Sequence, residues 1–370
     1  MSSWKSSADW TRFWTVLNTV EEEKRMQALV YNSAWDVALE ERPVPAIEKD
    51  NQVLVRIKAT GVCGTDLGIV SGKYQASSSI ILGHESAGEV VLVGKSVTTL
   101  MPGDRVVIDP TYYCGQCGMC RTGRQNHCAH KSVTETGVSA DGTFTDYYVA
   151  EDRFLYKLQD HVSYEEATLT EPLSCILTGI NQINLLPSFR TIVLGAGPIG
   201  ILYSHALASK GVTGSLVDIS KERLFKAGSI APARWEAYDS FQAAVEAADP
   251  SGRQVDLIVD TTGVVGTQVI SNLANGGYLM LVGLRDGTST FNPKEIVDRS
   301  LKIIGSIDSL GTFSTAHYLI EQRIVPAKEI ITHTFPLDRY KEAFHALGCD
   351  LNERTLSPSS HAIKVILQSS

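Results

Sequence analysis

Four cysteines in one short segment form the densest group of reactive side chains in the sequence. They are Cys114, Cys117, Cys120 and Cys128, separated by two, two and seven residues. Four thiolates in one lobe can satisfy a tetrahedral zinc ion and leave no open position, which is typical of a structural site. A reducing compartment disfavours disulfides, and Ala129 rather than proline follows the last cysteine, unlike an iron–sulfur motif. We expect a structural zinc that pins a loop with little core of its own.

A glycine-rich turn is the second feature with a specific chemistry. Thr191–Leu194 has the pattern of a buried strand, a G-x-G-x-x-G segment follows, and residues 201–210 have the pattern of a helix. In this context the glycines permit a tight turn, the close approach of a pyrophosphate and the packing of the helix on the strand. The helix N-terminus offers free N–H groups to the phosphates. The candidate cofactor-binding residues are Gly195, Gly197, Pro198, Ile199, Gly200, Asp218 and Arg223.

The acid after the second strand of this region indicates which dinucleotide is bound. Asp218 lies eighteen residues after Gly200 and can bind both ribose hydroxyls of the adenosine half. A carboxylate there repels the 2′-phosphate of NADP, so the sequence favours NAD. Lys221 and Arg223 are near enough to keep NADP as an alternative.

A third group of metal-ligating types is dispersed along the chain. It comprises Cys63, the neighbouring His84 and Glu85, and Glu171. Taken one at a time, these residues have ordinary explanations: a small core residue, a buried imidazole, a solvated charge and an acid at a helix start. Only their combination points to a metal site.

Composition excludes several classes of function. The 370 residues carry 33 Lys and Arg against 41 Asp and Glu, a net charge of −8, and no basic cluster is visible. Nucleic acids and acidic membrane surfaces both need a basic footprint, so neither is expected as a partner. The longest uncharged stretch, Thr191–Ser209, divides into strand, turn and helix, so we interpret it as core rather than a membrane span. Seven cysteines and no visible secretory signal favour the cytoplasm.

Two kinds of periodicity divide the chain. From Met26 to about Leu158, short β-branched runs alternate with Gly, Pro and Asp turns. From about Pro187 to Ile307, short apolar strands alternate with helix-length segments, which predicts βαβ units and a parallel sheet. The last residues include an apolar strand at 362–367, and we expect them to return to the first domain. Residues 1–25 are expected to form an extension with a helical apolar face, which lies on the surface or contacts another subunit.

Taken in order, these motifs resemble the zinc-dependent medium-chain dehydrogenases/reductases, the alcohol dehydrogenase superfamily. The resemblance covers nearly the whole chain from Met26 onward, and it is greatest to the sorbitol (polyol) dehydrogenase branch. The pointer to that branch is Glu171, where ethanol-type dehydrogenases carry a cysteine. The segments that carry the resemblance are Gly61–Asp66, Gly83–Gly94, Pro102–Val106, the four-cysteine lobe, Glu171–Ser174 and Gly195–Gly200.

The resemblance implies an α/β fold with two domains and a homodimer or homotetramer. A β-rich GroES-like catalytic domain would comprise residues 26–174 and 312–370, with the structural-zinc lobe at 112–130. A Rossmann coenzyme domain with a doubly wound parallel sheet would comprise residues 175–311.

The resemblance also assigns roles around a second, catalytic zinc. Its ligands would be Cys63, His84 and either Glu85 or Glu171, whereas Cys175 is disfavoured by its offset from the motif. Asp66 would orient the metal-bound imidazole. Zn²⁺ with an open position would bind the substrate oxygen as a Lewis acid, so that hydride can pass to the nicotinamide. The hydroxyl of Thr65 would pass on the substrate proton, with a plain structural threonine as the alternative.

Three positions depart from the family pattern. Gly68 stands where a relay histidine is frequent, so the outer relay must use water, the cofactor ribose or another group. Ile69 replaces an aromatic residue, and Asp308 with Ser309 replaces an Arg-Tyr pair, which makes simple sorbitol a less suitable substrate. Asp308 would suit an amine-bearing substrate, or it faces solvent.

The sequence therefore predicts hydride transfer between NAD and a secondary alcohol: a polyol, cyclitol or amino-polyol. One alternative is an NADP(H)-dependent alcohol dehydrogenase or ketone reductase acting on a simpler alcohol. Another is a non-catalytic NAD-binding scaffold.

Overall fold

The computed structural model describes residues 25–249, 254–264, 266, 268–284, 287–357 and 362–369. The expected N-terminal extension lies outside these residues, apart from Arg25. The chain folds into two compact units. The first contains the described residues up to Glu171 and those of Ile331–Pro358 and Lys364–Ser370, and the second those of Pro172–Ile330 and Ser359–Ile363. None of the helices in the described ranges combines the length and apolar character that a bilayer crossing requires.

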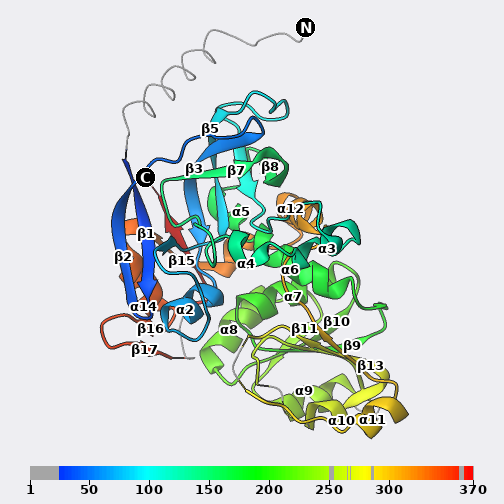
Figure 1. The fold of residues 1–370 in the computed structure, drawn as a ribbon. Coiled ribbons are helices and arrows are strands. Elements are labelled where there is room, and N and C mark those ends of the chain that lie inside the picture. Colours follow the sequence, from blue (N-terminus) through cyan, green and yellow to red (C-terminus); the bar gives the residue numbers. More distant parts are fainter. Residues whose placement is uncertain are drawn as a thin grey trace. The chain divides into compact units, whose positions relative to one another are not determined.

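The first unit is built on a largely antiparallel sheet (Figure 1). Within the described residues its strand order is β15-β18-β3-β5-β6-β8, and β7 also pairs with β3. Only the β15–β18 pair is parallel. The strands are β3 (Gln52–Gly61), β5 (Glu85–Val93), β6 (Arg105–Ile108), β7 (Tyr147–Glu151), β8 (Leu155–Lys157), β15 (Ile331–Pro336) and β18 (Lys364–Gln368).

Both faces of this sheet pack against apolar clusters, and β3 contributes side chains to each of them. Val53, Val55 and Ile57 pack into one apolar cluster, whereas Leu54 packs into a second cluster with β1. This alternation follows from the two-residue period of a strand. The second cluster lies under a smaller sheet of order β2-β1-β4, with β1 (Arg25–Ser33), β2 (Asp36–Pro43) and β4 (Ile80–Ile81). A further short pair is β16 (Cys349–Asp350) with β17 (Thr355–Leu356).

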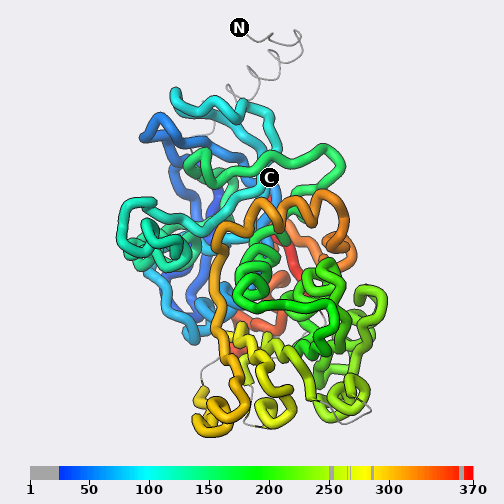
Figure 2. The backbone as a smooth tube through the Cα atoms, turned by 90° about the vertical axis from the view of Figure 1, so that its right-hand side faces the viewer, coloured from blue at the N-terminus to red at the C-terminus, as the bar shows by residue number. Residues whose placement is uncertain are grey.

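Short helices connect the strands of the first unit. They are α2 (Gly64–Val70), α3 (Gly118–Arg121), α4 (Lys131–Thr134), α5 (Tyr164–Thr168) and α14 (Tyr340–Ala346), with 3₁₀ turns at Gln125–His127, Asp152–Phe154 and Leu337–Arg339. The tube in Figure 2 follows the chain from the blue strands of this unit, through the second unit, to the red strand β18.

The second unit is a doubly wound parallel sheet. Its order within the described residues is β11-β10-β9-β12-β13-β14, and every pair is parallel. The chain winds outward from β9 to β11 and then from β12 to β14, so its direction reverses between β9 and β12. The strands are β9 (Arg190–Leu194), β10 (Thr213–Val217), β11 (Trp235–Tyr238), β12 (Val255–Asp260), β13 (Leu273–Leu281) and β14 (Lys302–Gly305).

Helices cover this sheet, and α7 is almost entirely buried against it. One core cluster joins Ile192 and Ile258 of the sheet to Ala244 of α9 and Val269 of α10. Of the helices in this unit, α7, α8, α9 and α10 contact the sheet most. The helices are α6 (Thr170–Ile180), which begins in the first unit, α7 (Pro198–Ala208), α8 (Lys221–Ile230), α9 (Phe241–Ala248), α10 (Gln268–Ser271), α11 (Pro293–Asp298), α12 (Phe313–Glu321) and α13 (Ala327–Ile330). The predicted α/β class, with a β-rich part and a parallel-sheet part, is confirmed.

The contacts of Arg105 account for the Pro102–Val106 segment, one of the motifs that carry the family resemblance. Its Nη1 donates to the carbonyls of Gln159 and Asp160 at 3.1 and 3.2 Å, and its Nη2 to that of Val162 at 2.6 Å. The guanidinium carbon lies 4.4 Å from the ring centroid of Tyr164. One arginine at the start of β6 therefore holds the segment that leads into α5.

We expect Arg105→Lys to lower the free energy of unfolding by about 1–3 kcal/mol. A lysine cannot make the forked bonds to these carbonyls or stack on the ring. Urea denaturation measures the change. Arg339→Lys is the matched control, because the Arg339 side chain is 52% exposed, and its ion pair with Glu342 and its contact with the Phe335 ring both lie within its own segment. Equal stabilities for the two variants would contradict this account of the motif.

Candidate functional site

The end of β3 fixes the first candidate metal ligand. Cys63 immediately precedes α2, and its backbone N–H donates to Asp66 Oδ2 at 2.8 Å. Asp66 is fully buried, so this bond sets the start of the helix firmly. Thr65 stands in the first turn of α2, with its Oγ1 3.7 Å from Cys63 Sγ. The thiol and the hydroxyl therefore lie close together.

The register of the sheet brings His84 and Glu85 to the same place. β3 and β5 are antiparallel, and Gly61 pairs with Glu85, so the end of one strand lies beside the start of the other. Ligand atoms of Cys63, His84 and Glu85 all lie within 4.8 Å of one another. A thiolate, an imidazole and a carboxylate are zinc donors, and three protein ligands leave a position open. Glu171, in the first turn of α6, is also buried, but it is not part of this close set.

The pair formed by His84 and Asp66 tests whether a metal fits here. His84 Nδ1 lies 3.8 Å from Asp66 Oδ1, and both atoms are buried without a hydrogen-bond partner. Burial lowers the pKa of His84, but Asp66 and Cys63 outweigh it and hold that pKa well above the ordinary value. Burial, opposed by His84, raises the pKa of Asp66. A cation on the other ring nitrogen would keep the imidazole neutral and direct Nδ1–H at Asp66, so the residues fit a metal.

Lys364 is a part of the site that the sequence did not reveal. This lysine begins β18, is 3% exposed, and pairs with Glu85, which is 1% exposed. Its Nζ also donates to the carbonyl of Val62 at 3.1 Å. Burial lowers the pKa of Lys364, but Glu85, Cys63 and Glu171 together raise it above the usual value, so the ammonium stays charged. The sequence signal that could have pointed to Lys364 is its single charge inside the apolar run 362–367.

The four cysteines of the lobe gather their sulfur atoms into one cluster. The Sγ atoms of Cys117 and Cys120 are 3.4 Å apart, those of Cys114 and Cys120 3.9 Å, and those of Cys117 and Cys128 4.0 Å. None of these cysteines is in a disulfide. The backbone N–H of Ala129 is the main influence that lowers the pKa of Cys117 to about 6, whereas burial raises that of Cys120 to about 12. A thiolate already favoured beside three more sulfurs is the donor chemistry of a closed zinc site.

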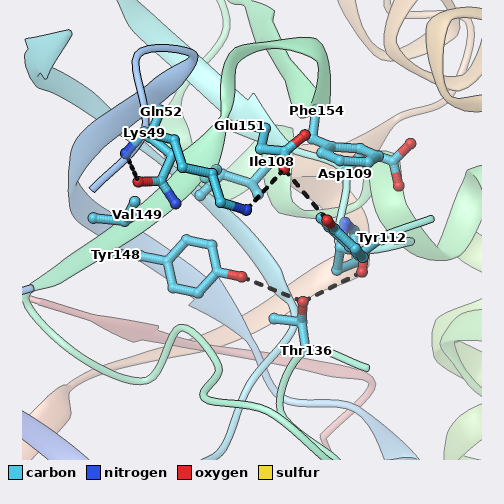
Figure 3. Close-up of a pocket in the computed structure, with 12 residues that line it drawn as sticks. Lys49, Gln52, Ile108, Asp109, Tyr112, Thr136, Tyr148, Val149, Glu151 and Phe154 are labelled. Carbon is cyan, nitrogen blue, oxygen red and sulfur yellow. Dashed lines mark hydrogen bonds and ion pairs between the residues drawn. The ribbon is translucent and has the colours of Figure 1, made fainter. Parts of the chain in front are cut away.

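Aromatic side chains attach this four-cysteine loop to β7 and its following turn. The Arg153 guanidinium lies over the rings of Tyr112, Tyr113 and Phe154, and it donates to the carbonyl of Tyr113 at 2.7 Å. Beside it is a hollow of about 220 Å³, where Tyr112 bonds Glu151 and Tyr148 bonds Thr136 (Figure 3). The hollow contains none of the candidate ligands, so we assign it to the support of the loop rather than to chemistry.

Each glycine of the loop between β9 and α7 is explained by a different feature of its surroundings. Gly195 has φ +101°, a conformation that L side chains rarely adopt. A Cβ on Gly200 would overlap the carbonyl oxygen of Gly195, so the helix can approach the loop only without a side chain there. A Cβ on Gly197 would meet no atom within 4 Å. The protein itself does not require that glycine, and the open space at the helix start fits a phosphate group. Pro198 and Ile199 form the half-buried first turn of α7.

Asp218 lies at the end of β10, directly against this loop. Its Oδ2 accepts from the N–H of Ala196 and its Oδ1 from the N–H of Ser220, both at 2.9 Å. The carboxylate is half-buried and oriented by these two bonds, and each oxygen retains a lone pair for a ribose hydroxyl. Arg223 lies in the first turn of α8 and is also half-buried.

The positions that depart from the family pattern have mixed surroundings. Ile69 is fully buried among the core residues. A Cβ on Gly68 would lie 3.2 Å from Tyr74 Cβ, so Tyr74 occupies part of the space beside the missing histidine. Asp308 is half-buried with φ +58°, and Ser309 Oγ lies 3.3 Å from Thr312 Oγ1. Cys175 belongs to the second unit and is absent from the close donor set.

Comparisons with known proteins cover nearly the whole chain. Residues 49–160 match the alcohol dehydrogenase GroES-like domain, and residues 165–351 match the glucose dehydrogenase C-terminus. A sorbitol dehydrogenase of Bombyx mori is 30% identical over 352 residues, which are 92% of this chain and 97% of that protein. D-xylulose reductase A of Aspergillus oryzae is 32% identical over 346 residues, 89% and 95% of the two chains. The crystal structure of 2R,3R-butanediol dehydrogenase from Bacillus subtilis matches with a TM-score of 0.79 and 26% identity, over 93% of this chain and 100% of that one.

Two alanine variants should separate a glycine kept for the fold from one kept for a ligand. Gly200→Ala should lower the free energy of unfolding by about 1–3 kcal/mol, because its Cβ overlaps backbone. Gly197→Ala should leave stability unchanged but weaken NAD binding roughly tenfold or more, about 1.4 kcal/mol. Thermal denaturation and a fluorescence titration with NADH measure the two quantities. If Gly197→Ala bound NADH as tightly as the parent protein, the loop would not hold the pyrophosphate.

Proposed function

The chain belongs to the zinc-dependent medium-chain dehydrogenase/reductase family, where it is most like the sorbitol (polyol) dehydrogenases, and from this premise we propose that it transfers a hydride between NAD and a polyol, cyclitol or amino-polyol. It is an alcohol-oxidising enzyme, and the oxidised product is a ketone. The observation that carries the proposal is the close set of Cys63, His84 and Glu85 donor atoms at the end of β3 and the start of β5.

The catalytic metal site is proposed at these three residues, with Glu171 as the alternative carboxylate. Zinc held there supplies Lewis acidity, which favours the deprotonated form of a substrate hydroxyl. Glu85 is preferred over Glu171 because only Glu85 belongs to the close set. With the metal bound to the other ring nitrogen of His84, Asp66 would accept from Nδ1–H and so would keep the ring in one tautomer and orientation. The second zinc is proposed at Cys114, Cys117, Cys120 and Cys128, where it stabilises the loop.

We assign to the Thr65 hydroxyl the role of accepting the proton that leaves the substrate hydroxyl and passing it on. Its position in the first turn of α2, next to Cys63, supports this role. A hydroxyl can accept one proton while it donates another, so it transfers charge without becoming an ion. Gly68 cannot continue the relay, and the next acceptor is therefore water or the cofactor ribose.

NAD rather than NADP is the proposed cofactor, bound at the glycine loop as the hydride acceptor. The support is Asp218, whose carboxylate is oriented against the loop by Ala196 and Ser220. The second candidate function is NADP(H)-dependent turnover of a simpler alcohol, favoured by Arg223 in the adjoining turn. A switch in preference between NAD and NADP on Asp218→Ala would support the first reading.

Assembly and location complete the proposal. A homodimer or homotetramer is carried over from the family resemblance. A cytoplasmic location is supported by the seven cysteines, none of which is in a disulfide.

A substrate panel tests the function directly. Purified enzyme should form NADH, followed by its absorbance at mildly alkaline pH, with at least one polyol, cyclitol or amino-polyol. A chelator should abolish this turnover while the fold persists, and zinc should restore it. Turnover only with NADPH and simple ketones would favour the second candidate. A protein that binds NADH but turns over no alcohol would contradict both.

Thr65 offers a sharper test of the proton path. Thr65→Ala should lower kcat by roughly 10²–10⁴-fold, the usual worth of a general acid–base group, with zinc content unchanged. Thr65→Ser keeps the hydroxyl and should retain most of the turnover. Steady-state kinetics, elemental analysis and melting temperature together separate chemistry from folding. Near-parental kcat in a well-folded Thr65→Ala enzyme would refute the assignment.

A further inference from the structure

The Glu85 carboxylate faces the candidate metal site with one oxygen, and it is also paired with the Lys364 ammonium. One carboxylate oxygen belongs to the set that lies within 4.8 Å of the Cys63 and His84 donors. Oε2 is paired with the ammonium of Lys364, which is itself buried. A buried carboxylate needs a charge partner, and here the fold supplies one before any metal binds.

The surrounding backbone is shaped for this ion pair. Lys364 Nζ donates to the carbonyl of Val62, the residue directly before Cys63. A Cβ on Gly61 would overlap Glu85 Oε2 and lie 2.9 Å from Lys364 Cε. The glycine of the Gly61–Asp66 motif is therefore explained by the space that the pair occupies. The pairs of β3 with β5 and of β3 with β18 bring both charges to the same glycine.

A metal at this site must then compete with Lys364 for the same carboxylate. Coordination by Glu85 draws the negative charge toward the metal, and it places a divalent cation near a buried ammonium that cannot move into water. Both effects oppose metal binding, whereas without Lys364 the carboxylate would have the metal as its only cation.

We propose that Lys364 is a positioning residue that competes with the catalytic metal for Glu85 and lowers the metal affinity of the site. The proposal rests on the proposed metal site at Cys63, His84 and Glu85. Because Lys364 pairs with Glu85, the Glu85 carboxylate coordinates the metal more weakly than the Cys63 thiolate does.

The test measures metal affinity and ligand geometry, not only turnover. Enzyme depleted of metal at the catalytic site is titrated with Co²⁺, whose visible absorption reports the ligands, and zinc affinity follows from competition. Lys364→Met should bind the metal roughly 10–100-fold more tightly, an effect of the size that changes behind a metal ligand usually have but of the opposite sign, because a competitor rather than a supporting group is removed. Its cobalt spectrum should shift because Glu85 coordinates more strongly. Lys157→Met is the matched control: this lysine is 48% exposed, pairs with Asp104, and should leave affinity and spectrum unchanged.

A double-mutant cycle covers the case in which Lys364→Met folds poorly. Glu85→Gln with Lys364→Met removes both charges and leaves no unpaired ion in the core. In the Glu85→Gln background, removal of the lysine should change metal affinity far less than in the parent. An equal gain in both backgrounds would mean simple repulsion, and weaker binding by Lys364→Met would mean that the lysine assists the metal; either result overturns the proposal. Parent enzyme that binds Co²⁺ as expected but oxidises no alcohol would refute the proposed function and leave this test standing.

Discussion

A carboxylate that stays charged in a protein interior needs a positive partner, and three strands of the first unit meet that requirement at Glu85. Its partner Lys364 comes from β18, which pairs with β3 on the side opposite β5. Three strands therefore converge on one ion pair, and Gly61 on the central strand provides the room. The same convergence brings the end of β3 and the start of β5 together, and with them Cys63 and His84. The donor set follows from strand register rather than from any local motif.

The dinucleotide site is built in a different way. Its glycines and Asp218 lie within one βαβ segment, and most of the contacts that shape it are made within that segment, with Thr261 and Thr262 beside Gly195 as the exception. Local sequence therefore determines the loop, whereas the metal site joins the end of β3 to the start of β5, and the Lys364 partner of Glu85 is 279 residues away along the chain. The two sites also differ in electrostatics. One offers backbone N–H groups to an anion, and the other offers anionic donors to a cation.

This difference decides how much could be predicted from the sequence. The parallel sheet and the glycine loop could be predicted because strand, turn and helix leave periodic patterns within a short window. The cysteine lobe could be predicted because its four ligands are close in sequence. Cys63, His84 and Glu85 are individually ambiguous, and only the family resemblance joined them. Lys364 was missed because its partner is 279 residues away and a lone lysine in a strand carries no pattern. The burial of Ile69 could not be predicted either, because sequence order does not tell which face of α2 turns inward.

The late position of β18 has a consequence for how the protein is made. Residues 172–330 of the second unit are synthesised between β5 and β18, so the sheet of the first unit stays incomplete while a whole other unit emerges. At roughly 5–20 residues per second, the interval between Glu85 and Lys364 lasts on the order of tens of seconds. During that time the nascent chain presents Cys63, His84 and Glu85 without the counter-charge that later neutralises the carboxylate. A newly made chain therefore presents this donor set to metal ions before Lys364 has paired with Glu85.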